Sequence, residues 1–286
     1  MPAGMPFSRG VWAIMLMILA TVACDSTVDT LSEEWDLASR ASDALPGSTL
    51  MDRWRPLSLE ERDEQIVQEV LSGNVPSWLR ILRTLSLERV VDGEWVPVRI
   101  GVLPDYLAVG SDNDYVLVPM SPQAAQRIAD ATGMMLPTST LVDEIWAQAE
   151  VKLAPLPIPP SSAMTTVPVF LQHDYRLGLQ RDSLGVPDSA WKAGHKKDVV
   201  LTGRMNTQAG RVAIYGWHRT NGQPIQPLYT GHTDRWVDYS HGIRLVSRSI
   251  LIDGEEADLK ALLEDADRSR WFLGDGPMQE ASYPIN

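Results

Sequence analysis

A predominantly apolar run from Val11 to Ala23 follows Arg9 near the beginning of the chain and ends in small residues. A cationic residue, a short apolar stretch and small residues after it are typical of a secretory signal peptide. The run is too short to cross a bilayer stably as a helix. The pattern predicts that residues 1–23 direct export and are removed, so that the rest of the chain folds outside the cytoplasm.

The apolar run ends in Thr21-Val22-Ala23-Cys24, which resembles the lipobox of bacterial lipoproteins. In that family the cysteine receives lipid, such as palmitate, and becomes the new N-terminus. The resemblance implies that Cys24 anchors the protein to a bacterial cell membrane, facing the periplasm or the exterior. Thr21 stands where the family usually has Leu, so an ordinary signal peptide is the alternative.

Cys24 is also the only cysteine of the chain. If it carries lipid, the folded part has no disulfide, no cysteine-ligated zinc and no cysteine nucleophile. The net charge of −12 argues against nucleic acid as a partner, because a polyanion would be repelled. The sequence has neither a Gly-x-Gly-x-x-Gly motif nor a phosphate loop, so it gives no support for a bound nucleotide.

Three regions follow from composition and periodicity. Residues 1–23 form the signal peptide, and residues 24–57 are acidic and without sustained periodicity, which predicts a flexible tether. Residues 58–286 are long enough to bury a core as one globular domain. We expect an α+β fold, with helices mostly in the first half and an antiparallel sheet in the second, joined by a proline-rich crossover at residues 154–160.

The predicted helices have clear start signals. Leu59 to Leu71 follows Ser58, whose spacing to Glu61 matches a capping box. Further helices are expected over residues 78–85, 121–132 and 138–149.

Two predicted strands, residues 95–102 and 105–109, lead into a turn at residues 110–114. In that turn Asp112 and Asp114 resemble half of a calcium-binding loop. The later Gly and Glu of an EF-hand loop are missing, which favours a plain hairpin turn.

All five histidines lie in the second half of the chain. Residues 198–203 and 211–217 are expected to form an antiparallel hairpin in which Asp198 faces Tyr215 and His195 faces His218. A third strand beginning at His241 is expected to lie antiparallel beside residues 211–217. His195, His218 and His241 would then converge at one edge of the sheet.

Imidazoles that converge in this way can ligate zinc and activate water, or share acid and base roles. His232, on the loop that covers this edge, is a further candidate ligand, and Asp198 and Asp238 are candidate carboxylates that act with the histidines. Nearby side chains are candidates for binding substrate, namely Lys197, Tyr215, Trp217, Tyr239 and Arg244.

These residues favour a hydrolase of an envelope or extracellular polymer that uses the His/Asp cluster, either without a metal or with zinc at the histidines. The alternative is a non-catalytic envelope- or glycan-binding lipoprotein whose histidines and aromatic residues line a groove. A serine hydrolase with Ser240 as nucleophile ranks lower, because Ser240 and His241 are adjacent on a strand and there is no Gly-x-Ser-x-Gly elbow. A third reading is structural, with Tyr239 and His241 closing a network of loops.

Three segments of this half are similar to signatures of a group of secreted bacterial proteins without an established activity. The segments are Gly194 to Val200, Tyr215 to His218 and Asp238 to Arg244. The resemblance spans most of the domain and implies no particular reaction.

Overall fold

Helices and small sheets alternate along the computed structural model, which describes Met1 and residues 31–91 and 93–285. The helices of the described residues are α1 (Gly47–Trp54), α2 (Leu59–Leu71), α3 (Pro122–Ala131), α4 (Ser139–Gln148), α5 (Val167–Leu184) and α6 (Leu259–Glu264). Short 3-10 helices occupy Ser77–Arg80, Ser162–Thr165, Gly203–Thr207 and Ser269–Trp271. The α+β class expected from the sequence is confirmed.

The largest sheet combines strands from both halves of the chain. Its order is β14-β13-β2-β12-β5, and β1 pairs with β2 as a long hairpin. The strands are β1 (Arg83–Val91), β2 (Glu94–Val102), β5 (Met134–Met135), β12 (Val246–Ser247), β13 (Ser249–Ile252) and β14 (Glu255–Asp258). The division into a helical first half and a sheet-forming second half is therefore less sharp than expected.

A second sheet has the order β10-β9-β8-β11. Its strands are β8 (Lys197–Val199), β9 (Ile214–His218), β10 (Pro224–Tyr229) and β11 (His241–Gly242). Two smaller pairs complete the fold, namely β3 (Ala108–Ser111) with β4 (Asp114–Leu117) and β6 (Val151–Lys152) with β7 (Lys192–Ala193).

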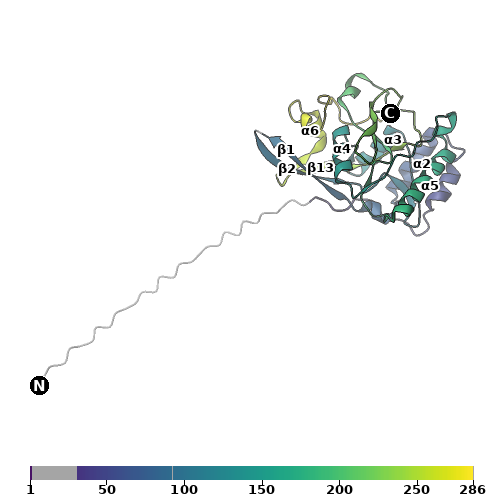
Figure 1. Cartoon of the computed structure of the whole chain (residues 1–286), viewed down its shortest axis with the longest axis horizontal. Helices are drawn as coiled ribbons and strands as arrows, with labels where there is room; N and C mark the ends of the chain where they lie inside the picture. Colours follow the sequence, from purple (N-terminus) through teal and green to yellow (C-terminus); the bar gives the residue numbers. More distant parts are fainter. Residues whose placement is uncertain (2–30, 92, 286) are drawn as a thin grey trace.

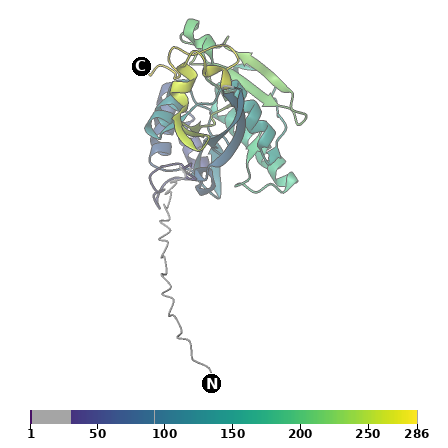
Figure 2. The ribbon, with the colours of Figure 1, turned by 90° about the vertical axis from the view of Figure 1, so that its left-hand side faces the viewer.

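The β1–β2 hairpin lies at one end of the molecule and helices α2 and α5 lie at the other (Figure 1). The C-terminal segment, yellow in Figures 1 and 2, packs beside this hairpin, where Arg89 donates a hydrogen bond to the carbonyl of Trp271.

Local capping signals explain the helices that the sequence predicts well. Helix α2 spans the predicted residues, and Ser58 and Glu61 form the expected capping box. The side chains of Ser121 and Thr138 accept hydrogen bonds from backbone amides at the start of α3 and α4. The prediction over residues 78–85 was wrong, because only Ser77–Arg80 is helical and β1 begins at Arg83.

Part of the predicted tether belongs to the folded domain. Helix α1 buries Leu50, Met51 and Trp54, and Trp35 is 2% exposed. The backbone amide of Trp35 donates to the carbonyl of Arg80 at 2.7 Å. The prediction of a flexible tether over residues 24–57 was therefore wrong for residues 31–57, because large apolar side chains spaced along this segment are buried in the core.

The turn between β3 and β4 is the expected hairpin, and its two aspartates accept hydrogen bonds from other segments of the chain. The carboxylate of Asp112 accepts hydrogen bonds from the amide and hydroxyl of Ser77, and that of Asp114 accepts them from the amide and hydroxyl of Ser48. Each aspartate thus binds the first turn of a helical segment, which accounts for both carboxylates without calcium.

The proline-rich crossover has no regular secondary structure, as the sequence predicts. The hydroxyl of Tyr239 accepts a hydrogen bond from the amide of Ile158 and donates one to the carbonyl of the same residue. Tyr239 therefore attaches the crossover to the loop before β11.

The predictions about the signal peptide and Cys24 concern residues 2–30, which lie outside the described residues. Among the helices that are described, none is long and apolar enough to cross a membrane.

Candidate functional site

Strand β8 lies between β9 and β11 and positions most of the predicted site residues. It pairs antiparallel with β9, and Asp198 faces Tyr215 as the sequence predicts. The other expected pairing was wrong, because β11 runs parallel to β8 and does not pair with β9; His241 faces Lys197. The segment after His241 bends into the first sheet after two residues, so a long strand never forms there.

The three histidines predicted to converge have three different carboxylate neighbours. The pairs are His195 with Asp105, His218 with Asp143, and His241 with Asp238. No group of three or more His, Cys, Asp or Glu side chains within the described part of the chain is arranged to hold a metal ion. The zinc site expected at His195, His218 and His241, with His232, therefore has no support in the geometry.

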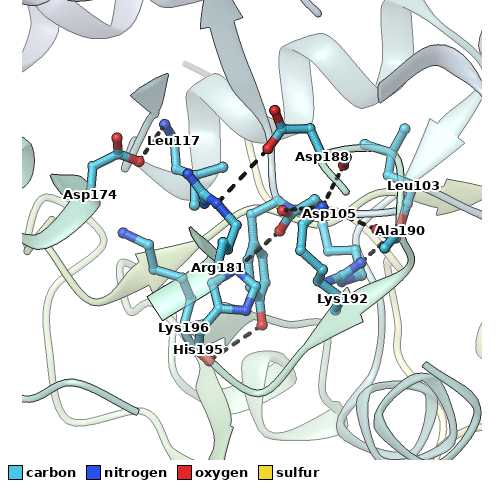
Figure 3. A network of polar contacts seen from close by, with 12 residues as sticks. Leu103, Asp105, Leu117, Asp174, Arg181, Asp188, Ala190, Lys192, His195 and Lys196 are labelled. Carbon is cyan, nitrogen blue, oxygen red and sulfur yellow. Dashed lines mark hydrogen bonds and ion pairs between the residues drawn. The ribbon is translucent and has the colours of Figure 1, made fainter. Parts of the chain in front are cut away.

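His195 belongs to a buried set of polar residues that we call the inner network, and Figure 3 labels three of its members, Asp105, Lys192 and His195. Its members are Asp105, Tyr106, Lys192, His195, Asp198 and Arg244, all 3% exposed or less. Asp105 Oδ1 lies 3.0 Å from His195 Nε2, and Asp105 Oδ2 lies 3.4 Å from Lys192 Nζ. Burial alone would raise the pKa of Asp105, but Lys192 and His195 lower it well below its usual range.

Arg244 and Asp198 are also fixed inside this network. Arg244 donates to the carbonyls of Leu103 and Lys192 at 2.8 and 2.6 Å, and Asp198 accepts a hydrogen bond from Tyr106 at 2.9 Å. Their polar groups face protein partners that are themselves buried, so the inner network joins β7 and β8 to the chain before β3. This arrangement suits a structural role better than the substrate contact and catalysis predicted for Arg244 and Asp198.

His218, at the end of β9, forms an outer pair with Asp143 of α4. His218 Nε2 is 2.8 Å from Asp143 Oδ1, and the hydroxyl of Tyr215 donates to the same carboxylate at 2.9 Å. The His218 ring stacks on Trp146 with ring centroids 5.6 Å apart. Because the Asp143 side chain is 53% exposed, this pair connects α4 to the sheet at the surface.

The remaining candidates lie where β11 meets β8, and we call Lys196, Lys197, Asp238, Ser240 and His241 the β11 cluster. The carbonyl of Ser240 accepts a hydrogen bond from the amide of Lys197 at 2.7 Å, which places the loop before β11 against the start of β8. Lys196 Nζ donates to the carbonyl of Tyr239 at 2.7 Å. The cluster therefore brings two ammonium groups, a carboxylate and an imidazole together.

Asp238 is the most firmly held member of the β11 cluster. Its Oδ1 accepts hydrogen bonds from the amide and hydroxyl of Ser240 at 2.7 and 2.5 Å, and its Oδ2 accepts one from Trp236 Nε1 at 3.2 Å. Since the Ser240 hydroxyl donates to a carboxylate, Ser240 orients Asp238 and is not poised as a nucleophile. The geometry therefore does not favour the serine hydrolase alternative.

The imidazole ring of His241 lies beside this fixed carboxylate but makes no hydrogen bond with any described residue. Its Nε2 is 3.9 Å from Asp238 Oδ2, it is 1% exposed, and neither ring nitrogen has a partner among the described residues. Burial lowers the pKa of His241 to about 4, although Asp238 opposes the change. The imidazole is therefore neutral near pH 7 and has a nitrogen free to accept a proton.

The charges of the cluster are set by burial and by one another. Burial alone would raise the pKa of Asp238, but His241, Ser240 and Lys197 lower it to about 2. Burial lowers the pKa of Lys196 to about 8 although three carboxylates, including Asp238, oppose the change. Asp238 is thus ionised near pH 7, and Lys196 loses its proton more readily than an ordinary lysine.

An aromatic rim leads from the surface to Asp238. It consists of Tyr229, which is 43% exposed, and the partly buried His232 and Trp236. The rings of Tyr229 and His232 meet edge to face at 5.2 Å between centroids, and those of His232 and Trp236 stack at 5.2 Å. The His232 ring therefore packs against both Tyr229 and Trp236. It does not take part in a metal site formed by described residues, contrary to the prediction from the sequence.

Trp217 lies next to the cluster with an unusual backbone. Its φ is 53°, a left-handed value that is strained for a large side chain. Its Nε1 donates to the carbonyl of His195 at 3.1 Å, and Lys197 Nζ lies 5.0 Å from its ring centroid. The strained backbone thus holds an indole ring beside the Lys197 ammonium.

Sequence reasoning missed several residues of these groups, and Asp105 and His173 are the clearest cases. Asp105 was expected only as the start of a strand, and His173 lies on α5, which was not predicted. His173 is fully buried, packs 4.8 Å from the Tyr239 ring, and has no hydrogen-bond partner on either ring nitrogen among the described residues. Burial lowers the pKa of His173 to about 2, with Lys196 adding to the effect. Its sequence neighbours carry no motif that would have revealed it.

Comparison with protein-family models, with curated proteins and with solved structures found no match to this chain.

Proposed function

We propose that this protein is a hydrolase of an envelope or extracellular polymer, in which Asp238 and His241 activate water. The observation that carries the proposal is the buried, neutral His241 imidazole with both nitrogens unpartnered beside a fixed, ionised carboxylate. A neutral imidazole can accept a proton from water, and an adjacent carboxylate stabilises the imidazolium that forms.

The aromatic rim supports a polymer made of sugars. Tyr229, His232 and Trp236 form a chain of contacting rings that ends at the Asp238 carboxylate. The apolar faces of sugar rings pack on aromatic side chains, and their hydroxyls bond to carboxylates and amines nearby. A glycan bound along the rim would approach the β11 cluster.

Hydrolysis can be tested by measuring soluble fragments released from purified cell-wall and extracellular polysaccharide preparations. We expect Asp238→Asn and His241→Gln each to reduce release by about 10²- to 10⁴-fold, the usual contribution of general acid–base catalysis. Asp182→Asn, which changes an exposed carboxylate of α5, serves as the matched control and should leave release unchanged. If both cluster variants release as many fragments as the wild type, Asp238 and His241 are not the catalytic residues.

A non-catalytic glycan-binding protein is the second candidate, and the aromatic rim is the observation in its favour. Binding of a glycan without any release of fragments by the wild-type protein would select this candidate. Trp236→Ala should then weaken binding, while His241→Gln should leave it nearly unchanged.

We further propose that the protein is exported and anchored to a bacterial membrane by lipid on Cys24. The sequence Thr21-Val22-Ala23-Cys24 after an apolar run supports this. Incorporation of an alkyne-labelled palmitate in the bacterial host should be detected in the wild-type protein and lost in Cys24→Ala. Equal labelling of the two would exclude Cys24 as the attachment point.

A further inference from the structure

The lysines of the chain are few and unevenly placed. Of the five, Lys192, Lys196 and Lys197 lie within six residues of one another, although the chain as a whole has a net charge of −12. Lys192 is paired with Asp105, and Lys196 donates to the carbonyl of Tyr239. The Lys197 ammonium makes neither a hydrogen bond nor an ion pair with any described residue, so it is the cation of this region that is left for a ligand.

Lys197 is held in place although it lacks a polar partner. Its ammonium lies over the Trp217 ring, whose orientation is fixed by the strained backbone and by the hydrogen bond to His195. Asp238 is the carboxylate that affects the pKa of Lys197, but it makes no ion pair with Lys197 and already accepts three hydrogen bonds from Ser240 and Trp236. A half-buried ammonium without a hydrogen bond or an ion pair is stabilised when an anion binds directly to it.

The aromatic rim lies next to this ammonium. The amide of Lys197 donates to the carbonyl of Ser240 at 2.7 Å, and Asp238, which binds the Ser240 hydroxyl, also accepts a hydrogen bond from Trp236 of the rim. A ligand that stacked on the rim would therefore bring its substituents to Lys197.

We propose that this site takes an acidic glycan, with a carboxylate of one sugar unit bound to the Lys197 ammonium and a neighbouring sugar ring stacked on Tyr229, His232 and Trp236. The inference rests on the proposed function, since it uses the same rim and cluster, and it adds the chemical class of the polymer. The long-range field of a chain with a net charge of −12 repels polyanions, so recognition of the carboxylate depends on this local contact.

The test is calorimetric titration of the purified protein with a galacturonic acid oligosaccharide and with its methyl ester, which has the same rings without the charge. The wild-type protein should bind the acid roughly tenfold or more tightly than the ester, as expected for a hydrogen bond to a charged group. In Lys197→Met, which keeps an unbranched side chain over Trp217, the two affinities should become equal.

Lys152→Met is the matched control, because Lys152 Nζ also lies over a tryptophan ring, 5.3 Å from the centroid of Trp146, but away from the cluster. It should keep the preference for the acid, and circular dichroism should show that both variants are folded. Equal binding of acid and ester by the wild-type protein would overturn the inference, but it would still support binding of a glycan at the aromatic rim. If the wild-type protein binds neither the acid nor the ester, the inference is overturned. Release of fragments from a different polymer would then show that the protein is still a hydrolase.

Discussion

Asp63 of α2 is a buried carboxylate that faces the start of α3. It is 7% exposed and accepts only long hydrogen bonds, 3.3 and 3.4 Å, from the amide of Ser121. Burial raises the pKa of Asp63 to about 6, although Ser121, Arg62 and Arg127 oppose the change. A carboxylate with this environment makes the stability of the fold depend on pH.

The sign of this dependence follows from proton binding. The unfolded chain has a pKa near ~3.9 for Asp, so between about pH 4 and pH 6 the folded state binds the proton more tightly than the unfolded state. The free energy of unfolding contributed by Asp63 therefore falls as pH rises through this window. At pH 7 the ionised, buried carboxylate destabilises the fold.

We predict that Asp63→Asn is more stable than the wild type by about 1–3 kcal/mol at pH 7, because the amide is neutral and its oxygen still accepts from Ser121. The advantage should vanish at pH 4, where Asp63 is protonated in the folded state. Urea unfolding at both pH values measures the difference. The same difference at pH 4 and pH 7 would contradict this account.

Single residues also limited what the sequence could predict about the site. The histidines and Asp238 were selected from their clustering in the sequence, and Asp238 does lie beside His241, but the carboxylates beside His195 and His218 were not predicted. Asp105 and Asp143 lie 90 and 75 residues before the histidines they contact. Such pairs depend on how distant elements pack, which a hydrophobic pattern does not encode.

At the scale of the elements, the β11–β8 pair requires close backbone contact at Gly242. A Cβ atom at this position would lie 2.5 Å from Tyr106 Cδ1 and 2.7 Å from Lys196 Cβ. Neither atom is the end of a flexible side chain, so the strand or its neighbours would have to move. The absence of a side chain at Gly242 therefore lets Tyr106 and Lys196 lie against β11.

We predict that Gly242→Ala lowers the free energy of unfolding by about 1–3 kcal/mol, the usual effect of overpacking a core. Gly274→Ala is the control, since a Cβ atom there meets no atom within 4 Å, and it should change stability by less than about 0.5 kcal/mol. Thermal and urea unfolding of the two variants provide the measurement. Equal stability of the two variants would show that β11 can shift without cost.

The elements also differ in how well the sequence predicts them. Helices α2, α3 and α4 were predicted closely because their caps are local signals. Helix α5 was not predicted, because apolar residues occur on its exposed side as well, with Tyr175 67% and Leu179 50% exposed. Strand β11 has only two residues, too few to show a period, so its parallel pairing could not be read from the pattern.

For the whole molecule, the main hydrophobic core extends to the first described residues. Trp35, Leu50, Met51 and Trp54 are each 2% exposed or less and belong to the same cluster as the apolar residues of the two larger sheets. The amide of Leu82 also donates to the carbonyl of Glu33 at 2.8 Å. Residues 31–57 are therefore part of the folding unit, although their acidic composition predicted a tether.

We predict that a chain beginning at Leu31 folds, whereas a chain beginning at Ser58 does not. Removing a large buried apolar side chain costs about 2–5 kcal/mol, so the loss of Trp35, Leu50, Met51 and Trp54 together would cost about 8–20 kcal/mol, which is comparable to the whole 5–15 kcal/mol that typically stabilises a domain. Near-ultraviolet circular dichroism and thermal unfolding should show a cooperative transition only for the longer chain. A cooperative transition for residues 58–286 would mean that this segment packs on a core that is complete without it, and would restore the tether as first predicted from composition.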